Sequence, residues 1–253
     1  MFHVKRLLGV NRVCYAPRME AWEQEVRIGL RAMGVPCDDA QVGQLLGHLA
    51  LVTEANRSFN LTTIPEAEFV ALHVLDSASA LAALECAPEG EFADIGSGAG
   101  FPGMPLGILS LRRVCLVESV KKKAGFLERA AAQLRLDASV RGVRAEELVA
   151  ERPEAFAAVT ARALSSLPSL VELAAPLLQM QGRLICLKGS PEREEISRGL
   201  AVAARCGMEL VSTTVVEVPG VDAQRTIVVY RRCAAGAVSL PRRNGMAQRQ
   251  PLA

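Results

Sequence analysis

From residue 92 onward the chain alternates short apolar runs with helical segments, and this alternation restricts the possible folds most. The apolar runs of strand length are 92–95, 114–117, 139–143, 156–160, 184–187, 210–218 and 226–230. Strands that alternate with helices predict an α/β fold, in which helices cover a mostly parallel sheet. The last two runs are joined by PGVDAQR, which is too short for a helix, so we expect an antiparallel hairpin at one edge.

The first 91 residues lack this alternation and predict helices. Apolar residues recur at helical spacing over 42–52, and Pro36 to Asp39 provide a break and an N-cap before them. A further helix is expected from Pro65 through residue 84. The expected parts of the chain are a disordered basic extension (1–20), N-terminal helices (21–85), an α/β domain (86–233) and a basic tail, mobile when unbound (234–253).

Charge and cysteine content restrict the class of protein. The net charge of +2 is unevenly placed, because residues 1–19 and 223–253 contain Lys and Arg but no acid. Basic ends favour a polyanionic partner, although solvated tails explain them equally well. An odd number of cysteines without a CxxC pair predicts reduced thiols in a cytoplasmic protein. We expect no metal site, since the 3 histidines lack ligand spacing, and no membrane span or secretory leader.

A glycine-rich segment, FADIGSGAGFPGMPLG at residues 92–107, begins with the first apolar run. It fails the dinucleotide pattern G-x-G-x-x-G from Gly96, because Phe101 holds the sixth position, while from Gly98 the pattern is interrupted by Pro102. Asp94 would repel a pyrophosphate and attract a cationic ligand. S-adenosylmethionine carries an ammonium and a sulfonium but no phosphate, so the segment favours it as the cofactor.

Glu118 ends the second apolar run and can accept hydrogen bonds from both hydroxyls of a ribose. This suits any adenosine-containing ligand, and a solvated acid at a strand end is the alternative. Two other functions therefore stay open at this point. One is a nicotinamide-dependent oxidoreductase that uses Gly98, Gly100 and Gly103. The other is a non-catalytic RNA-binding module.

Several segments resemble the glucose-inhibited division protein B family, bacterial methyltransferases that act on guanine N7 in 16S ribosomal RNA. FADIGSGAGFPGMPLGI and LVESVKKKAGFL carry the resemblance, supported by NRSFNLTTI (56–64), HVLDS, RAEEL, ARALSSL and LKG. It covers about residues 40–252. It implies a Rossmann-like (class I) methyltransferase fold with a seven-stranded sheet, S-adenosylmethionine as cofactor, and 16S ribosomal RNA or the small ribosomal subunit as partner. We expect a monomer.

The resemblance also implies roles for individual residues. Gly96 and Phe101 would line the methionine and adenosine side of the cofactor, Ala145 and Glu146 would contact the adenine region, and Arg162 would stand beside the cofactor. Together with the residues discussed above, the predicted cofactor-binding set is Asp94, Gly96, Gly98, Gly100, Phe101, Glu118, Ala145, Glu146 and Arg162.

The chain lacks the motifs that two kinds of target atom require, which reduces the number of possible targets. Amine methylation usually needs a [D/N]-P-P-[Y/F] segment after the fourth strand, where this chain has ARAL. Carbon methylation needs a nucleophilic cysteine, but Cys115 and Cys186 lie in apolar runs. Guanine N7 has a lone pair and no proton to lose, so in-line transfer needs positioning and no general base.

We therefore name no catalytic acid or base. The candidates for positioning guanine or phosphate are Arg162, Lys188, Arg57 and His73, with Asn60 and Asp76 nearby in sequence. A structural histidine and a solvated lysine are the alternatives for His73 and Lys188. Lys121, Lys122 and Lys123 suggest RNA contact or a solvated face.

Overall fold

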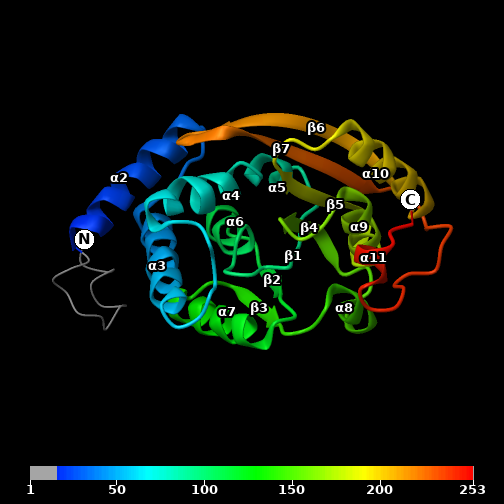
Figure 1. Ribbon diagram of the computed structural model, residues 1–253, viewed down its shortest axis with the longest axis horizontal. Helices are drawn as coiled ribbons and strands as arrows, with labels where there is room; N and C mark the ends of the chain where they lie inside the picture. Colours follow the sequence, from blue (N-terminus) through cyan, green and yellow to red (C-terminus); the bar gives the residue numbers. More distant parts are fainter. Residues whose placement is uncertain (1–15, 253) are drawn as a thin grey trace.

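The computed structural model describes residues 16–252, and its centre is a seven-stranded sheet with the order β3-β2-β1-β4-β5-β7-β6. Strands β1 to β5 are parallel, whereas β7 pairs antiparallel with both β5 and β6 (Figure 1). The strands are β1 (Phe92–Ile95), β2 (Val114–Val117), β3 (Ala138–Arg141), β4 (Phe156–Arg162), β5 (Leu178–Lys188), β6 (Met208–Val218) and β7 (Val221–Arg232). This confirms the predicted α/β class, the mostly parallel sheet and the hairpin at one edge.

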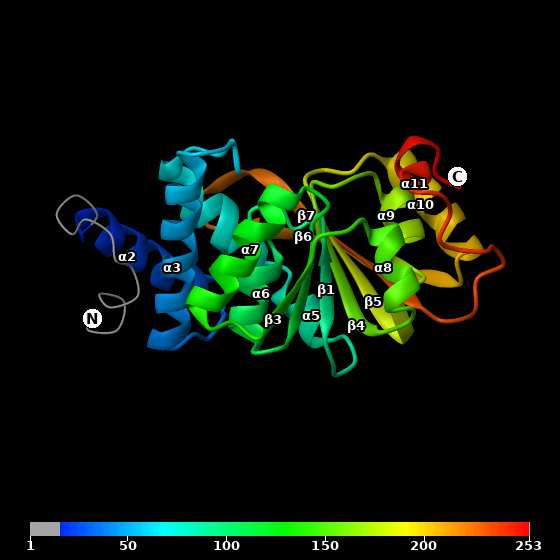
Figure 2. The same cartoon turned by 90° about the horizontal axis from the view of Figure 1, so that it is seen from below.

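Helices cover both faces of the sheet, as Figure 2 shows. Helices α6 (Gly103–Ser110) and α7 (Lys121–Leu134) lie on one face. Helices α8 (Ala145–Glu151), α9 (Leu167–Ala174) and α10 (Arg193–Arg205) lie on the other. Each face has its own apolar core, because the buried strand residues point alternately to the two sides.

The N-terminal helices form an outer layer over α6 and α7. Helix α3 (Asp39–Asn56) begins at the predicted break, where Asp38 and Gln41 form a reciprocal capping box. Helix α3 is joined to α6 by Gln41, whose Nε2 donates to the carbonyl oxygen of Ile108 at 2.9 Å. Since its buried residues include Leu45, Leu49 and Val52, the layer extends the apolar core of that face.

The boundary expected at residue 20 is wrong in part. Helix α2 spans Ala16–Ala32, so residues 16–20 are helical and not disordered. The helix is held because Trp22, Val26 and Leu30, spaced four residues apart, are buried in the core. The rest of the expected extension, residues 1–15, lies outside the described residues.

The single helix expected after Pro65 is divided into short pieces. They are a 3-10 helix η1 (Glu66–Glu68), a π-helix η2 (Val70–Leu75), α4 (Asp76–Ala78) and α5 (Leu81–Glu85). A π-helical turn is rare and is often found at functional sites. It places His73 and Asp76 on the side facing the carboxyl end of β4, where Arg162 contacts both.

The edge hairpin is longer than its apolar runs indicate. Strand β7 begins at Val221, so only Pro219 and Gly220 turn the chain, and Gly220 has a φ of +76°. The hairpin extends across the molecule toward the N-terminal helices (Figure 1), where a Cβ on Gly220 would lie 3.2 Å from Ala71. A chain segment distant in sequence thereby reaches the layer that carries His73.

The tail was expected to be mobile when unbound, and the structure contradicts this. Residues 240–252, called the C-terminal strap below, lie against α8 and α9 and include the short helix α11 (Met246–Arg249). Ala247 is buried, and the carbonyl of Leu252 accepts a hydrogen bond from Arg205. Hydrogen bonds and burial therefore order a segment that has no apolar periodicity.

Candidate active site

The glycine loop after β1 depends on backbone conformations that suit glycine. Gly96, Gly98 and Gly100 have φ values of +72°, +56° and +95°. A Cβ on Gly96 would lie 2.7 Å from Leu164, and one on Gly100 would lie 2.7 Å from Met104. At Gly98 the nearest atom would be 3.9 Å away. The loop is therefore packed at Gly96 and Gly100 and open above Gly98, which leaves room for a ligand to approach the backbone.

Asp94 lies beneath this loop and is completely buried. Its Oδ1 accepts a hydrogen bond from Thr160 Oγ1 at 2.8 Å, and its Oδ2 accepts one from the Gly103 amide at 3.2 Å. Burial raises the pKa of this carboxyl group to about 6. Asp94 thus joins β1, β4 and α6, and its attraction for a cationic ligand stays a prediction.

Glu118 follows β2 and turns its carboxylate toward the loop. Its Oε2 accepts the Gly98 amide at 2.9 Å, while its Oε1 accepts the Val120 amide at 2.8 Å. Each carboxylate oxygen can accept a further hydrogen bond. An acceptor beside the open position at Gly98 fits the ribose hydroxyls of an adenosine-containing cofactor.

Phe101 stands between two histidine rings. The ring of His48 stacks on it at 4.4 Å and the ring of His73 at 4.1 Å between centroids. Burial lowers the pKa of His48 to about 4 and lowers the pKa of His73 as well, so both rings are neutral at pH 7. Sequence reasoning missed His48. Its position on the apolar face of α3, three residues after Leu45, signals its burial but not its partner.

Arg162 lies beside this stack of three rings and contacts His73. Its Nη1 donates to the Leu72 carbonyl and to Asp76 Oδ2, both at 2.7 Å, and its Nη2 lies 3.1 Å from His73 Nδ1. Its guanidinium carbon lies 5.5 Å from the centre of the Phe101 ring. The structure therefore brings together Arg162, His73 and Phe101, which the sequence had named separately.

Asp76 also binds a residue that sequence reasoning did not place in the site. Its Oδ1 accepts a hydrogen bond from Arg225 Nε at 2.7 Å. Arg225 lies in β7, near the turn of the long hairpin. The Asp76 carboxylate therefore links the N-terminal layer, β4 and β7. No local pattern signals this pair, because 149 residues separate its members.

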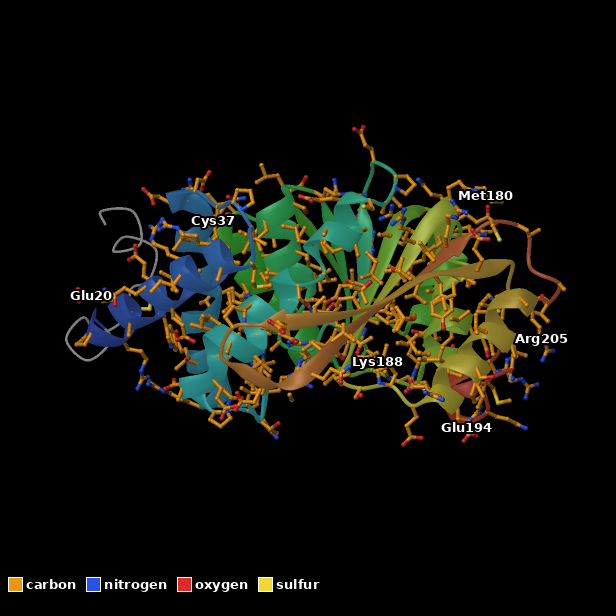
Figure 3. The ribbon with its side chains drawn as sticks, turned by 90° about the horizontal axis from the view of Figure 1, so that it is seen from above. Glu20, Cys37, Met180, Lys188, Glu194 and Arg205 are labelled. Atoms are coloured by element: carbon orange, nitrogen blue, oxygen red, sulfur yellow. The ribbon has the colours of Figure 1, made fainter. Side chains whose placement is uncertain are left out.

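The remaining positioning candidates are Lys188 and Arg57. Lys188 Nζ is 2.8 Å from Glu195 Oε1 and donates to the Ser165 carbonyl at 3.2 Å. Figure 3 shows Lys188 between the N-terminal helices and α10. Arg57, at the end of α3, lines a cleft of about 280 Å³ whose other lining residues include Phe69. Phe69 contacts His73 at 5.1 Å between ring centres, which connects the cleft to the stack.

Ala145 and Glu146 open α8, the helix that follows β3. Both are largely buried, and Glu146 Oε1 accepts a hydrogen bond from the Gly245 amide at 2.7 Å. The carboxyl ends of adjacent parallel strands lie at one edge of a sheet, so α8 begins on the same edge as the glycine loop. These residues therefore lie at the same edge of the sheet as the glycine loop, and their contact with the adenine region stays a prediction.

The strand order, the loop after β1 and the acid after β2 define the class I methyltransferase fold, and solved structures share it. The YcgJ protein from Bacillus subtilis matches with a TM-score of 0.51 and 13% identity, covering 65% of this chain and 100% of that one. A putative transferase from Pyrococcus horikoshii matches with a TM-score of 0.50 and 11% identity, covering 62% and 63%. At these identities the likeness concerns the fold alone.

Sequence comparison gives the family. Residues 41–228 match the family described as rRNA small subunit methyltransferase G. A protein of that name from Roseiflexus sp. (strain RS-1) is 39% identical over 227 residues, which are 88% of this chain and 96% of the relative. One from Pelotomaculum thermopropionicum is 35% identical over 240 residues, covering 92% and 100%. The chain belongs to this family and is an S-adenosylmethionine-dependent methyltransferase.

These findings confirm the predicted family resemblance, the cofactor and the enzyme class, and the nicotinamide-dependent alternative is set aside. The individual residue assignments stay predictions. Among residues 16–252, no helix is long and apolar enough to cross a membrane. The same residues contain no cluster of three or more potential metal-binding side chains.

Proposed function

We propose that the protein transfers a methyl group from S-adenosylmethionine to N7 of a guanine in the decoding-region loop of 16S ribosomal RNA. The family supports the cofactor and small-subunit ribosomal RNA as the substrate. The observation that carries the proposal is the site at the end of β4, where Arg162 is fixed by Asp76 and Leu72. A fixed guanidinium suits recognition of guanine O6 or of phosphate.

The chemistry follows from the nucleophile. The in-plane lone pair of N7 forms the new N–C bond as the C–S bond of the sulfonium breaks, and the positive charge passes to the purine. No proton leaves N7, so no base is required. The residues of this chain act by holding the two reactants in line, which can contribute on the order of 7–11 kcal/mol.

The histidine and cysteine side chains described here fit a methyl transfer that needs no base and no nucleophilic thiol. The ring nitrogens of His73 are engaged by Arg162 and by Thr62 Oγ1, the latter at 3.1 Å, and burial holds the ring neutral. Cys115 and Cys186 are buried in the strands, and burial raises the pKa of both thiols, that of Cys186 to about 12. Neither thiol is suited to attack a base, which favours a ring nitrogen over a ring carbon as the target.

Mapping of the product tests the proposal. Ribosomal RNA from a strain that lacks this chain is incubated with the protein and S-adenosylmethionine, both as naked RNA and as small subunits. Borohydride reduction followed by aniline treatment cleaves RNA at N7-methylguanine, and primer extension locates the cleavage. We expect one cleavage in the decoding region. A methyl group that mass analysis places on an exocyclic amine or a ring carbon would refute the proposed target.

We further propose that the enzyme works as a monomer in the cytoplasm, where the ribosomal RNA substrate lies. Size-exclusion chromatography with light scattering, at the concentration used in the methylation assay, tests the oligomeric state. A stable dimer under those conditions would contradict the monomer.

A further inference from the structure

The C-terminal strap is anchored by an ion pair between Arg242 and the buried Glu172. Arg242 Nε and Nη2 donate to the two carboxylate oxygens of Glu172, each at 2.6 Å, and Glu172 is only 2% exposed. Leu252 adds its amide to the same carboxylate at 3.2 Å, while Arg242 Nη2 also donates to the Gln250 carbonyl at 2.7 Å. A bidentate pair of this kind fixes both direction and distance. The strap is therefore tied to α9 at two of its positions.

From this anchor the strap reaches the start of α8. The Gly245 amide donates to Glu146 Oε1 at 2.7 Å, and Asn244 Nδ2 donates to Glu147 Oε1 at 2.7 Å. Gly245 has a φ of +77°, which directs its amide at Glu146 as the chain enters α11. Arg242 fixes the position from which this amide is presented. The orientation of the Glu146 carboxylate thus depends on a segment almost 100 residues away in sequence.

We infer that the C-terminal strap, acting through Arg242 and Gly245, positions Glu146 to recognise the adenine of S-adenosylmethionine. This rests on the proposed placing of Ala145 and Glu146 beside the adenine. With Oε1 held by the strap, Oε2 is directed to accept a hydrogen bond from the 6-amino group of adenine. A carboxylate that is already oriented loses less entropy on binding, and it discriminates against a ligand with an oxygen at that position.

Through Arg242 the strap then acts as a positioning element. Arg242, counted in the sequence among the basic residues suited to a polyanion, uses its Nε and Nη2 donors on Glu172 and Gln250. Arg243 is its natural control, because it is the next residue, carries the same charge and has an exposed side chain. Loss of either arginine changes the net charge equally, but only one of them holds the strap.

Calorimetric titration with two ligands tests the inference. S-adenosylhomocysteine carries the 6-amino group, and its deaminated analogue, S-inosylhomocysteine, carries an oxygen there. For Arg242→Ala we expect affinity for the first ligand to fall about tenfold, the scale of one hydrogen bond to a charged group. The preference for the amino ligand should fall with it. Arg243→Ala should keep both the affinity and the preference.

Two further variants keep the result decisive. Arg242→Lys retains a cation beside the buried Glu172 but not the two-pronged contact, so it should fold and lose part of the preference. Equal weakening of both ligands in the Arg242 variants, with the preference unchanged, would overturn the inference. The variant Gly96→Arg distinguishes failure of the strap inference from failure of the proposed cofactor site. If Gly96→Arg abolishes binding of S-adenosylhomocysteine while the Arg242 variants bind it normally, only the strap inference fails. If the unaltered protein binds neither ligand, the proposed cofactor site fails.

Discussion

Asp94 shows how burial changes the chemistry of one residue in this site. The pKa of its carboxyl group is raised from 3.8 to about 6, chiefly by burial, against hydrogen bonds from Thr160 and Gly103. Because the folded pKa lies above the unfolded one, the ionised carboxylate destabilises the fold above pH 6. That cost disappears as the pH falls from 6 toward 4. A cationic ligand on the loop would favour the ionised form and offset the cost.

This linkage predicts a pH dependence of cofactor binding. Affinity for S-adenosylmethionine should rise by up to about tenfold between pH 5 and pH 7, as Asp94 ionises. Asp94→Asn should remove this rise, weaken binding at pH 7 and raise the thermal stability of the free protein at that pH. Calorimetry at several pH values measures the first two effects, and Asp137→Asn, with a side chain that is 72% exposed, is the control. An unchanged pH profile in Asp94→Asn would show that its charge does not act on the ligand.

At the scale of elements, the glycine loop and α7 offer a matched pair of substitutions. Gly100 has a φ of +95°, and a Cβ there would lie 2.7 Å from Met104 Sδ and 2.9 Å from His48 Nε2. Gly125 lies inside α7, where the nearest atom to a Cβ would be Arg129 Nη1 at 3.5 Å. The same added methyl group is therefore strained in one element and accommodated in the other.

Gly100→Ala should lower both the free energy of unfolding and the affinity for S-adenosylmethionine, because it displaces the loop and the His48 ring. Gly125→Ala should raise the free energy of unfolding by about 0.5–1 kcal/mol, since alanine favours a helix, and leave the affinity unchanged. Urea denaturation and calorimetry measure the two quantities. Normal cofactor binding by Gly100→Ala would mean that the loop conformation is not needed to hold the ligand.

Sequence reasoning succeeded best for elements whose burial is uniform. Strands β1 and β2 were predicted to the residue, because each is buried on both sides and lies between loops. Strand β7 was predicted only over 226–230, since its first five residues are mostly exposed and form no apolar run. Those residues form a strand because they pair with β6, as Arg225 does with Val216. Such pairing between strands requires no apolar run in the sequence, so it could not be predicted from one. The short pieces after Pro65 likewise follow from packing, not from local preference.

The same distinction explains the candidate site. The glycines, Asp94 and Glu118 could be identified because each is recognised by its position relative to the end of a single strand. The stack of His48, Phe101 and His73 joins three separate segments, and its geometry could not be obtained from spacing. The basic tail was interpreted through its charge, since nothing in the sequence indicates that its anchor, Glu172, is buried 70 residues away.

For the molecule as a whole, the structure redistributes the basic charge that suggested a polyanionic partner. The C-terminal arginines that form ion pairs with acids of the body are Arg225, Arg231, Arg232 and Arg242. Their charge is largely neutralised within the fold. Lys122, in contrast, opens α7 and lies 4.5 Å from the ring centre of Phe59, in the segment that also carries Arg57. We therefore propose the start of α7 as a further contact with RNA, and the contact of the tail stays a prediction.

Lys122→Ala combined with Lys123→Ala should weaken binding to ribosomal RNA and make its salt dependence shallower by about 1.4–1.8 in log–log slope, the value for two lost phosphate contacts. Fluorescence anisotropy with a decoding-region fragment at increasing KCl measures the slope. The free energy of unfolding should change by less than about 0.5 kcal/mol, because the lost cation–π contact is offset by relief of cations at a helix N-terminus.

Arg193→Ala combined with Arg198→Ala removes the same charge from α10, which lies far from α7 (Figure 1). If RNA is held at the start of α7, this control should keep the slope of the unaltered protein, because screening in 0.15 M salt confines a charge to about 8 Å. Equal changes in both double variants would instead show that the whole charge of the molecule, and not a defined face, attracts the RNA. Cofactor affinity should stay constant in both, which separates loss of the substrate from loss of the methyl donor.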